Sequence, residues 1–586
     1  MLIKSVAEKL HEHGLAPPDL EFLRPNEHRY TALLMQPCSP ILANGQRIGP
    51  ADVAAAAAKG RRFLELACEE HGHLAITPEY YFPWSALKEA ITDGVTPPLD
   101  ALWVIGSEST TQDELERFKQ EIAEHCLVLH EPWENLAQDR TLLDPVTLLF
   151  HTKKQDQTLQ LVALIQFKTY PSRDDFFFEE SLLRKGTQIY KFAGTSGHLF
   201  AATIICSDAL DIEPVLGQLN YQSTLIHIQL NPSPTHRLYR QYRTKTFQTD
   251  ADATNCHIVC LNWAHLVEEV DAEGGKPKPW NNISASTWYC PKNKCSSADQ
   301  IVRPNHNLGL YYTYMEERRH ALRFHNEEAV FKLLVPKLIC VAAAQMANHN
   351  GPIMVGRYTW NTGTKSWMSE ENPPKDGFNE YLVNHQNAKI ALAGVLGAND
   401  PLAVERVLAL SAGKISASET WHSLENIDSC ILEQDEVVRR ISVVQDDQGD
   451  NFRHLRISVI SEIHYLLKNH PEWPKQVAGV DANSTVQWSM QDRNFNVRTV
   501  DEKPTLIVYL DDTHTPKQIT NRADKLYELL RKAGSRHQKR LCIVRREHGQ
   551  IQFVQIEALT RIDEANLEMT DIAAIHPLDD PEPDHG

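Results

Sequence analysis

The chain has 586 residues, with 59 Lys and Arg against 77 Asp and Glu, which gives a formal net charge of −18. Hydrophobic residues make up 42% of the chain and charged residues 23%. This mixture excludes a collagen, a coiled coil and a chain that is disordered throughout. The negative balance argues against a nucleic-acid binder that relies on overall charge. At about 150 residues per domain, the length predicts roughly four units.

No segment of the sequence predicts a membrane anchor or a leader. The apolar run around 334–346 is interrupted by Lys337 and Gln345, and it falls short of the ~18–20 residues that a membrane helix needs. Residues 1–14 lack the apolar core and the small-residue cleavage site of a secretory signal. We therefore expect a cytoplasmic protein without a membrane partner.

The eleven cysteines do not suggest a disulfide framework, because their number is odd and their spacing is scattered. Cys290 and Cys295 are compatible with a metal knuckle, but no second pair lies at a suitable distance. Structural zinc sites usually need four converging ligands, so no metal is expected. Cys68, Cys260 and Cys542 lie in apolar stretches and are interpreted as small buried hydrophobes.

Secondary-structure patterns divide the chain into a short leading segment and a large mixed region. Residues 1–27 are predicted to form an amphipathic helix and a Pro-containing connector, and strand and helix patterns alternate from about residue 28. Hairpins are predicted at 146–167 and 321–335. Buried strands are predicted at 31–36, 74–77, 101–106, 126–130, 198–206, 223–230 and 256–263, and helices at 51–70 and 113–125. The mixture predicts a layered α/β domain over 28–338 with mixed sheets.

Beyond residue 338 the pattern changes. Residues 339–500 are expected to form a mainly helical extension, with helical periodicity at 381–470 and a polar, turn-rich loop at 363–380. Residues 501–586 are predicted to form a small α/β unit of strand, helix, strand and strand, followed by an acidic tail.

A basic cluster stands out in this last unit. Its members are Arg531, Lys532, Arg536, Lys539, Arg540, Arg545 and Arg546. One interpretation is a helix C-terminus followed by a solvated strand edge, because cations favour the negative end of the helix dipole. The other is a docking surface for an acidic protein partner or for nucleic acid. No phosphate-binding Gly loop or metal-ligand pattern accompanies the cluster, so the half beyond 338 is expected to regulate or recruit rather than to perform chemistry.

Three apolar strands end in a reactive residue that is followed by a tight polar or aromatic loop. LAITPEYYFPW carries Glu79, LVALIQFKTYPSRDD carries Lys168, and LFAATIICSDAL carries Cys206. Strand ends in layered α/β domains converge on one edge of a sheet, where ligand crevices open. A thiol can act as nucleophile, a carboxylate can take its proton, and a cation can stabilise the oxyanion. Together these three residue types predict an acyl-transfer site.

Each of the three residues also has an ordinary interpretation. Glu79 fits a solvated loop, Lys168 fits the point where a strand reaches the surface, and Cys206 fits a small core residue. Their occurrence in this order, with suitable elements between them, is what favours a site.

The same residues resemble the nitrilase or carbon–nitrogen hydrolase superfamily. Members of that family present a Glu in a strand-end Pro-Glu motif, a Lys after a hairpin and a Cys in an Ile-Cys-x-Asp motif. Here these are Pro78-Glu79, Lys168 after the hairpin at 146–167, and Ile205-Cys206-Ser207-Asp208. The segments VIGSES, FFEESLLRKG with Glu179, QLNPSP with Asn231, and CLNWA resemble further parts of the family pattern. The resemblance covers about 28–338; the rest of the chain matches no family that we recognise.

The resemblance implies a four-layer α-β-β-α sandwich and hydrolysis of a non-peptide carbon–nitrogen bond in an amide or nitrile. It implies that Glu79 is the general base and Cys206 the nucleophile. Lys168 and the backbone N–H of Ser207 would stabilise the negative charge, and Glu179 would orient Lys168 or the substrate. No step requires a metal or an organic cofactor. Because the family commonly dimerises, self-association is also expected.

Departures from the family pattern concern the substrate rather than the three central residues. The aromatic-Pro-Glu segment after the Cys motif is replaced by 209–212, and residues 264–310 are longer and more polar than usual. The candidate substrate-pocket residues are Tyr80, Tyr81, Phe177, Asn231, His236 and Arg237. The aromatic ones fit equally well as packing residues at the sheet edge, and the basic ones as solvated loop residues.

Three functions remain open from the sequence. The first is a stand-alone amidase or nitrilase of small-molecule metabolism. The second is a nitrilase-like effector or sensor that is regulated through its C-terminal half, for example in bacterial antiviral defence. The third is a scaffold that kept the fold and lost turnover. The presence of Glu79, Lys168 and Cys206 argues against the third, and the long extension argues mildly against the first.

Overall fold

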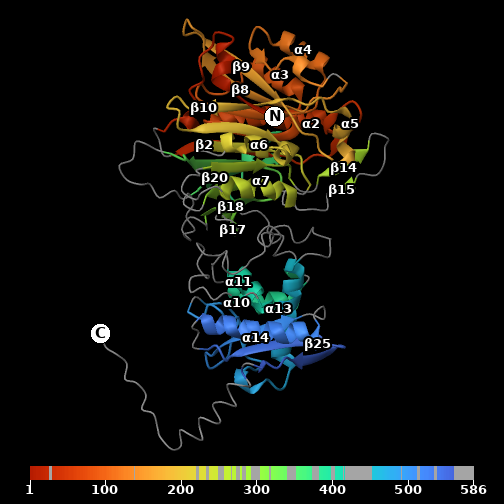
Figure 1. Ribbon diagram of the computed structural model, residues 1–586, viewed down its shortest axis with the longest axis vertical. Coiled ribbons are helices and arrows are strands. Elements are labelled where there is room, and N and C mark those ends of the chain that lie inside the picture. The colour runs from red at the N-terminus through yellow and green to blue at the C-terminus, as the bar shows by residue number, and fades with distance from the viewer. Residues whose placement is uncertain are drawn as a thin grey trace, which may run out of the picture. The chain divides into compact units, whose positions relative to one another are not determined.

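The computed structural model contains two compact units, formed by residues of 1–377 and of 378–586. Figure 1 draws the first in red to green and the second in teal to blue. The structure describes residues 1–25, 29–137, 139–219, 223–232, 237–248, 256–264, 267–271, 278–279, 286–291, 304–305, 307–315, 319–339, 351–372, 382–383, 385–396, 403–413, 415, 452–489, 491–510, 515–533, 537–557 and 559.

A mixed sheet of nine strands forms one half of the first unit. In spatial order its strands are β21 (Ser366–Ser369), β20 (Ile353–Asn361), β19 (Ala329–Pro336), β2 (Arg29–Gln36), β5 (Leu74–Phe82), β6 (Leu102–Ser107), β8 (Pro145–Lys153), β9 (Leu159–Phe167) and β7 (Leu127–Leu129). The central strands β2, β5 and β6 are parallel, whereas β8 and β9 are antiparallel neighbours. The hairpin predicted at 146–167 is therefore confirmed.

A second mixed sheet has eight strands. In spatial order they are β1 (Leu2–Ser5), β10 (Gln188–Ala193), β11 (Phe200–Ile205), β12 (Ser223–Ile228), β13 (Cys256–Leu261), β16 (Thr287–Pro291), β18 (Arg319–Phe324) and β17 (Leu310–Met315). Strands β11, β12 and β13 are parallel, and helices α6 (Glu213–Leu219) and α7 (Arg237–Gln248) lie between them in the sequence. A smaller sheet joins β15 (Lys278–Pro279), β14 (Glu268–Asp271), β3 (Ile41–Ala43) and β4 (Ile48–Pro50).

The two large sheets contact each other through their central strands. Strands β12 and β13 contact β5, and β13 also contacts β2. All residues of β12 and β13 are buried, as is expected of parallel strands that are covered on both faces. Helix α2 (Val53–Glu69) packs on β5 and on α3 (Trp84–Thr92), while α6 contacts β11 and α7 contacts β13. Helices α1 (Val6–His11), α4 (Gln112–Glu121) and α5 (Glu179–Leu182) also belong to this unit.

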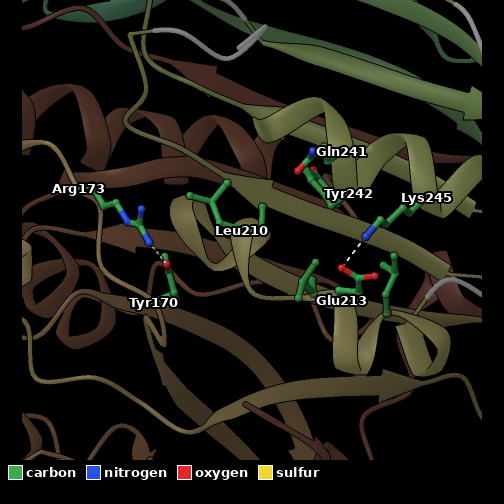
Figure 2. A pocket seen from close by; sticks show the side chains of 10 residues that line it. Tyr170, Arg173, Leu210, Glu213, Gln241, Tyr242 and Lys245 are labelled. Atoms are coloured by element: carbon green, nitrogen blue, oxygen red, sulfur yellow. Dashed lines mark hydrogen bonds and ion pairs between the residues drawn. The ribbon is translucent and has the colours of Figure 1, made fainter. Parts of the chain in front are cut away.

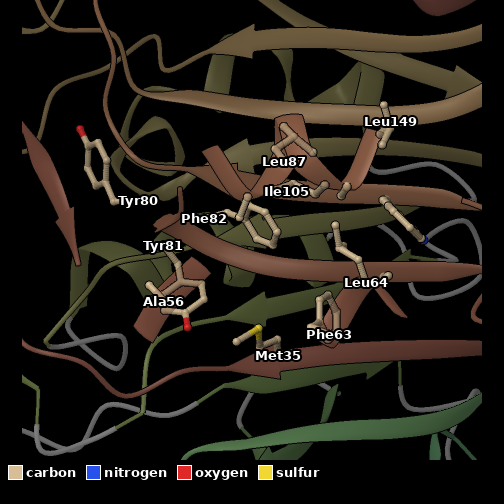
Figure 3. Packing of buried hydrophobic residues seen from close by; sticks show 14 of the residues in the cluster. Met35, Ala56, Phe63, Leu64, Tyr80, Tyr81, Phe82, Leu87, Ile105 and Leu149 are labelled. Atoms are coloured by element: carbon tan, nitrogen blue, oxygen red, sulfur yellow. The ribbon is translucent and has the colours of Figure 1, made fainter. Parts of the chain in front are cut away.

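The core under α2 fixes the position of β5, the strand that carries Glu79. Helix α2 begins where the Asp52 side chain accepts a hydrogen bond from the backbone N–H of Ala55 at 2.9 Å. Its buried residues include Phe63, which lies with Phe82 and Met35 in the cluster of Figure 3. Full burial of a side chain of this size contributes about 1.5–3 kcal/mol. The cluster therefore anchors both ends of the segment around Glu79.

Two parts of the first unit differ from the expected layout. Residues 2–5 form strand β1, which pairs in parallel with β10, so the leading segment is not helical throughout. Strand β20 pairs with β19 and β21 pairs with β20. The nine-stranded sheet therefore continues to Ser369, beyond the boundary expected at 338, and residues 366–369 of the expected loop are a strand. Residues 340–350 of the expected helical extension lie outside the described residues.

The second unit combines helices with a five-stranded sheet. The helices in its described residues include α10 (Gln386–Leu396), α11 (Ala403–Ser411), α13 (Phe452–Asn469) and α14 (Pro516–Lys532). The strands of the sheet are β22 (Thr485–Val486), β23 (Val497–Arg498), β24 (Pro504–Leu510), β25 (Leu541–Glu547) and β26 (Gln550–Phe553). Strands β24 and β25 are parallel, with α14 between them in the sequence. Among the described residues of the chain, no helix is both long enough and apolar enough to cross a membrane.

Candidate active site

The bulge in β5 places Glu79 in the protein interior. The pairing of β5 with β6 runs regularly to Thr77, then resumes at Phe82, so that residues 78–81 are looped out of the ladder. The adjoining strand accommodates this bulge because it carries a glycine: a Cβ at Gly106 would lie 2.1 Å from the Pro78 carbonyl oxygen. Tyr80 has a φ of 59°, which a non-glycine residue seldom adopts. Glu79 itself is only 1% exposed.

Lys168 lies directly after β9, and its ammonium group is surrounded by carboxyl groups. Its Nζ is 2.7 Å from Glu79 Oε1, 2.8 Å from Glu179 Oε1 and 3.3 Å from Asp144 Oδ2. All four side chains are buried. The structure thus brings together two predicted catalytic residues, Glu79 and Lys168, and the predicted supporting residue Glu179.

If all three buried carboxyl groups were charged, one ammonium could not neutralise them, and the net negative charge left in the interior would cost free energy. Burial raises the pKa of Glu79, and the neighbouring Glu179 adds to this while Lys168 opposes it. Burial also raises the pKa of Asp144 well above its usual value. Burial by itself would lower the pKa of Lys168, but the charges of Glu179, Glu79 and Asp144 outweigh it and raise that pKa well above normal. The cluster therefore keeps a charged ammonium and favours proton uptake on Glu79 and Asp144.

The oxygens of the two glutamates in this cluster are held by further specific donors. Glu79 Oε2 accepts the backbone N–H of Leu230 at 2.5 Å. Glu179 Oε1 accepts the Tyr80 hydroxyl at 3.0 Å, and its Oε2 accepts the backbone N–H of Ser172 at 2.6 Å. These contacts restrict the rotation of both carboxyl groups. A fixed carboxylate beside a fixed cation is the preorganised arrangement that electrostatic catalysis requires.

Cys206 follows β11 and begins the short 3-10 helix η4 (Cys206–Leu210). Its φ is 38° and its side chain is almost fully buried. Its Sγ lies 3.7 Å from the hydroxyl of Tyr239. Burial raises the pKa of the Cys206 thiol well above its usual value, the charge of Glu79 raises it further, and the charge of Lys168 lowers it. These shifts favour the protonated thiol, so nucleophilic attack by Cys206 calls for a base.

The segment after Lys168 is fastened to the turn after Cys206. Asp208 Oδ1 accepts the backbone N–H groups of Thr169 and Tyr170 at 2.7 and 2.8 Å, and the Thr169 hydroxyl at 2.8 Å. Ser207 Oγ donates to the Tyr170 carbonyl at 2.7 Å. Ser207 is fully buried. Through these bonds the end of β9 and the end of β11, which belong to different sheets, meet at one place.

The other predicted pocket residues have mixed positions. Tyr81 and Phe177 belong to the buried hydrophobic cluster, and Tyr81 packs edge-on against Trp263 with ring centroids 5.3 Å apart. Asn231 donates its backbone N–H to Asn262 Oδ1, and Asn262 Nδ2 donates to the Asn231 carbonyl. The surroundings of Tyr81 and Phe177 thus fit the interpretation that both are packing residues. His236 and the Arg237 side chain lie outside the described part of the chain.

A pocket of about 210 Å³ opens beside the Cys206 turn. It is lined by Tyr170, Arg173, Ala209, Leu210, Ile212, Glu213, Leu216, Gln241, Tyr242 and Lys245. Figure 2 shows two polar contacts across its walls: Arg173 donates to the Tyr170 hydroxyl at 3.1 Å, and Lys245 lies 2.5 Å from Glu213. The pocket has apolar residues between these charged ones, and it shares the turn 206–210 with the nucleophile candidate.

Three residues near the site were not singled out from the sequence. Asp144 precedes β8, His227 lies in β12 and Tyr239 lies in α7. Only Asp144 had a local signal, since a carboxylate stands before the Pro that opens the hairpin strand. The carboxyl oxygens of Glu79, Asp144 and Glu179 lie within 4.8 Å of one another, a spacing suited to a metal ion. In this structure Lys168 supplies the positive charge among them.

The basic cluster of the second unit is partly engaged within that unit. Arg531 pairs with Glu528 and Arg546 pairs with Glu462. Arg540 donates to the Ala478 carbonyl. These contacts fit the interpretation of a solvated surface, and recognition of an acidic partner stays a prediction.

Comparison with known proteins gives structural matches only. No family model and no curated protein matches the chain. A glutamine-dependent NAD+ synthetase from Acinetobacter baumannii is 12% identical over 95% of this chain and 69% of its own, with a TM-score of 0.30. A carbon–nitrogen hydrolase from Helicobacter pylori G27 is 11% identical over 44% and 82%, with a TM-score of 0.28. An amidase from Nesterenkonia sp. is 10% identical over 51% and 90%, with a TM-score of 0.27. At these values the matches establish neither the activity nor the site of this chain.

Proposed function

We propose that the chain is a thiol-dependent hydrolase of a non-peptide carbon–nitrogen bond, in an amide or a nitrile, and that its first unit is a four-layer α-β-β-α sandwich. One observation carries the proposal. A buried lysine lies between two glutamates, and its charge and that of Glu79 act on a buried thiol that follows a strand of the other large sheet. The contacts of α2 with one sheet and of α6 and α7 with the other support the layered arrangement.

The reaction proceeds in two halves. Glu79 takes the proton of the Cys206 thiol, and the thiolate attacks the amide or nitrile carbon to form a carbon–sulfur bond. Lys168 and the backbone N–H of Ser207 stabilise the negative charge that develops on the amide oxygen or nitrile nitrogen. With an amide, the proton returns from Glu79 to the nitrogen, the carbon–nitrogen bond breaks and an amine or ammonia leaves. Water, deprotonated by Glu79, then hydrolyses the thioester to a carboxylic acid and restores the thiol.

A nitrile follows the same route with one additional water. Attack of the thiolate gives a thioimidate, and addition of water to its carbon allows ammonia to leave and yields the same thioester. Glu179 orients Lys168 in both cases, because its Oε1 receives the ammonium while its Oε2 is held by Ser172. Charge balance within the cluster allows Glu79 to hold the proton between the steps.

The test is ammonia release from a panel of small amides and nitriles. The full-length protein should release ammonia from at least one of them, and Cys206→Ala should release none above background. Cys256→Ala provides a matched control, because Cys256 is also buried but lies at the start of β13. Equal loss in both variants, or retained turnover in Cys206→Ala, would reject Cys206 as the nucleophile.

We also propose that the second unit regulates or recruits rather than catalyses, and that the protein self-associates through its first unit. The separate compact core of the second unit supports the first statement. A chain ending at residue 377 should keep Cys206-dependent ammonia release if it is soluble and folded. Light scattering of the full chain should give a mass above 66.6 kDa; a monomer mass would reject self-association.

A further inference from the structure

A histidine on the strand next to Cys206 contacts the backbone of the candidate nucleophile. In the parallel pairing of β11 and β12, His227 is opposite Ile204. Ile204 stands two residues before Cys206, so His227 lies beside the end of β11 that leads into Cys206. Its ring is completely buried, with Nε2 at 2.9 Å from the Cys206 carbonyl oxygen.

The opposite nitrogen of this ring contacts a tyrosine of α7. His227 Nδ1 lies 2.6 Å from the Tyr242 hydroxyl, and the two rings meet edge-on with centroids 5.2 Å apart. The Cys206 carbonyl oxygen can only accept, so Nε2 must carry the hydrogen. Nδ1 is then an acceptor, and the Tyr242 hydroxyl donates to it. One tautomer of a neutral ring thus satisfies both contacts.

Helix α7 presents two tyrosines to this part of the site. Tyr239 and Tyr242 are three residues apart, which places them on the same face of the helix. Tyr239 reaches Cys206 Sγ, while Tyr242 reaches His227 and also lines the pocket of Figure 2. The thiol and the carbonyl of Cys206 are therefore both contacted, directly or through His227, from one helix turn.

The contact has a function because the conformation of Cys206 is strained. A φ of 38° in a residue with a Cβ costs free energy, and such a conformation persists only when the surroundings fix it. A leucine or methionine would fill the position of His227 without burying polar nitrogens. The ring is accommodated by its hydrogen bonds, one of which holds the strained residue.

We propose that His227, oriented by Tyr242, is a positioning residue that holds Cys206 in its left-handed conformation so that the thiol faces Glu79. The inference rests on the proposed function, because it assumes that Glu79 accepts the thiol proton. His227 does not touch the reacting atoms, and it acts through the backbone of Cys206.

The test measures how fast iodoacetamide alkylates Cys206 in the full-length protein, by quantitative peptide mass spectrometry at one neutral pH. His227→Leu removes both hydrogen bonds, and His227→Gln keeps an N–H donor that can reach the Cys206 carbonyl. Each is combined with Glu79→Gln to complete a double-mutant cycle. His257→Leu is the control, because His257 is a buried histidine on the neighbouring strand β13 that packs against Trp288.

Loss of one hydrogen bond to the nucleophile should slow labelling about tenfold in His227→Leu. His227→Gln should recover most of the rate, and His257→Leu should label like the wild type. In the Glu79→Gln background, His227→Leu should change the rate by less than about twofold, because the two residues act on the same step. A merely structural effect of His227 would persist in that background.

Labelling of His227→Leu at or above the wild-type rate would overturn the inference, and so would an undiminished loss in the Glu79→Gln background. Failure of the proposed function leaves a different result: Glu79→Gln alone would label at the wild-type rate, and both claims would then fall. If His227→Leu does not fold, the comparison of His227→Gln with wild type and with His227→Asn decides. A labelling rate for His227→Asn equal to that for His227→Gln contradicts the inference, because the shorter amide should not reach the carbonyl.

Discussion

The first unit buries two lysines in very different surroundings. Lys337, just after β19, lies 2.6 Å from Glu21 Oε1, and Glu21 also pairs with Arg24 at 2.8 Å. Lys168 lies among three carboxyl groups, two of them at 2.7 and 2.8 Å. Both lysines are about 1% exposed, so burial does not distinguish them. The two lysines differ in the number of carboxyl groups around the ammonium, and only Lys168 has Cys206, whose backbone is strained, as a charge-coupled neighbour.

The comparison shows which kind of buried charge indicates a site. The pair of Lys337 and Glu21 joins a strand end to the short helix η1 (Glu21–Leu23), which is a structural role. In the Lys168 cluster, burial together with the neighbouring acid groups raises the pKa values of Glu79 and Asp144, and such perturbation is concentrated at functional sites. Three predictions follow the contrast between these two lysines.

Substitution of either lysine by methionine should destabilise the protein, but only one should affect the reaction. Removing one partner of a buried ion pair costs about 3–5 kcal/mol, so chemical unfolding should show a large loss for Lys168→Met and for Lys337→Met. Loss of a charge-stabilising donor lowers the rate by about 10²–10³, so ammonia release should fall by that factor in Lys168→Met. A similar fall in folded Lys337→Met would remove the distinction.

The carboxyl partners of the two lysines should also differ in how much stability is lost when they are substituted. Glu21→Gln should cost about 3–5 kcal/mol, because it leaves Lys337 buried beside a neutral group. Asp144→Asn should cost less than about 1.5 kcal/mol near neutral pH, since burial raises the pKa of Asp144 and favours its neutral form.

The raised pKa of Asp144 sets the direction in which stability changes with pH. A group whose folded pKa exceeds its unfolded value contributes stability at low pH and loses it as the pH rises through the folded pKa. Wild-type protein should therefore lose stability relative to Asp144→Asn as the pH is raised. Parallel unfolding curves for the two proteins at every pH would show that Asp144 has an ordinary pKa.

His227 should also change how stability depends on pH, by a smaller amount and in the opposite direction. Burial, with the charges of Arg243 and Lys168, lowers its pKa to about 3, against the hydrogen bond to Cys206. A depressed histidine pKa favours the neutral folded form, so its contribution is present above about 6.5 and declines as the pH falls toward 3. Wild-type protein should lose stability relative to His227→Gln when the pH is lowered from 7 to about 5. An identical pH dependence in both would contradict this assignment.

The candidate residues that could be proposed from the sequence are those that follow an apolar run. Glu79, Lys168 and Cys206 each follow an apolar run, and runs of that kind are recognisable without a structure. Asp144, His227 and Tyr239 could not be grouped with them, because they come from three other elements that meet only through the packing of the two sheets. The bulge at 78–81 was equally hidden, since it depends on Gly106 in the next strand.

The secondary-structure predictions also succeeded where the signal is local and failed where it depends on tertiary contacts. The hairpin of β8 and β9 is local and was predicted, whereas β1 and β21 were missed. The hairpin predicted at 321–335 is wrong, because β18 and β19 belong to different sheets. Residues 2–5 merge into the helix that follows, and residues 366–369 lie in a polar, turn-rich segment. Both become strands because a partner strand is available, β10 in one case and β20 in the other. Strand formation of this kind depends on tertiary context more than on composition.

The most direct test of the proposed reaction is the mass of the protein when it is incubated with an amide that would give a slowly hydrolysed thioester. Peptide mapping should place the acyl group on Cys206, and the adduct should form in wild-type protein but be strongly reduced in Glu79→Gln and Lys168→Met. Cys256→Ala should form it normally. An acyl group on another cysteine, or equal adduct formation in all four proteins, would contradict the claim that Glu79, Lys168 and Cys206 act together as one site.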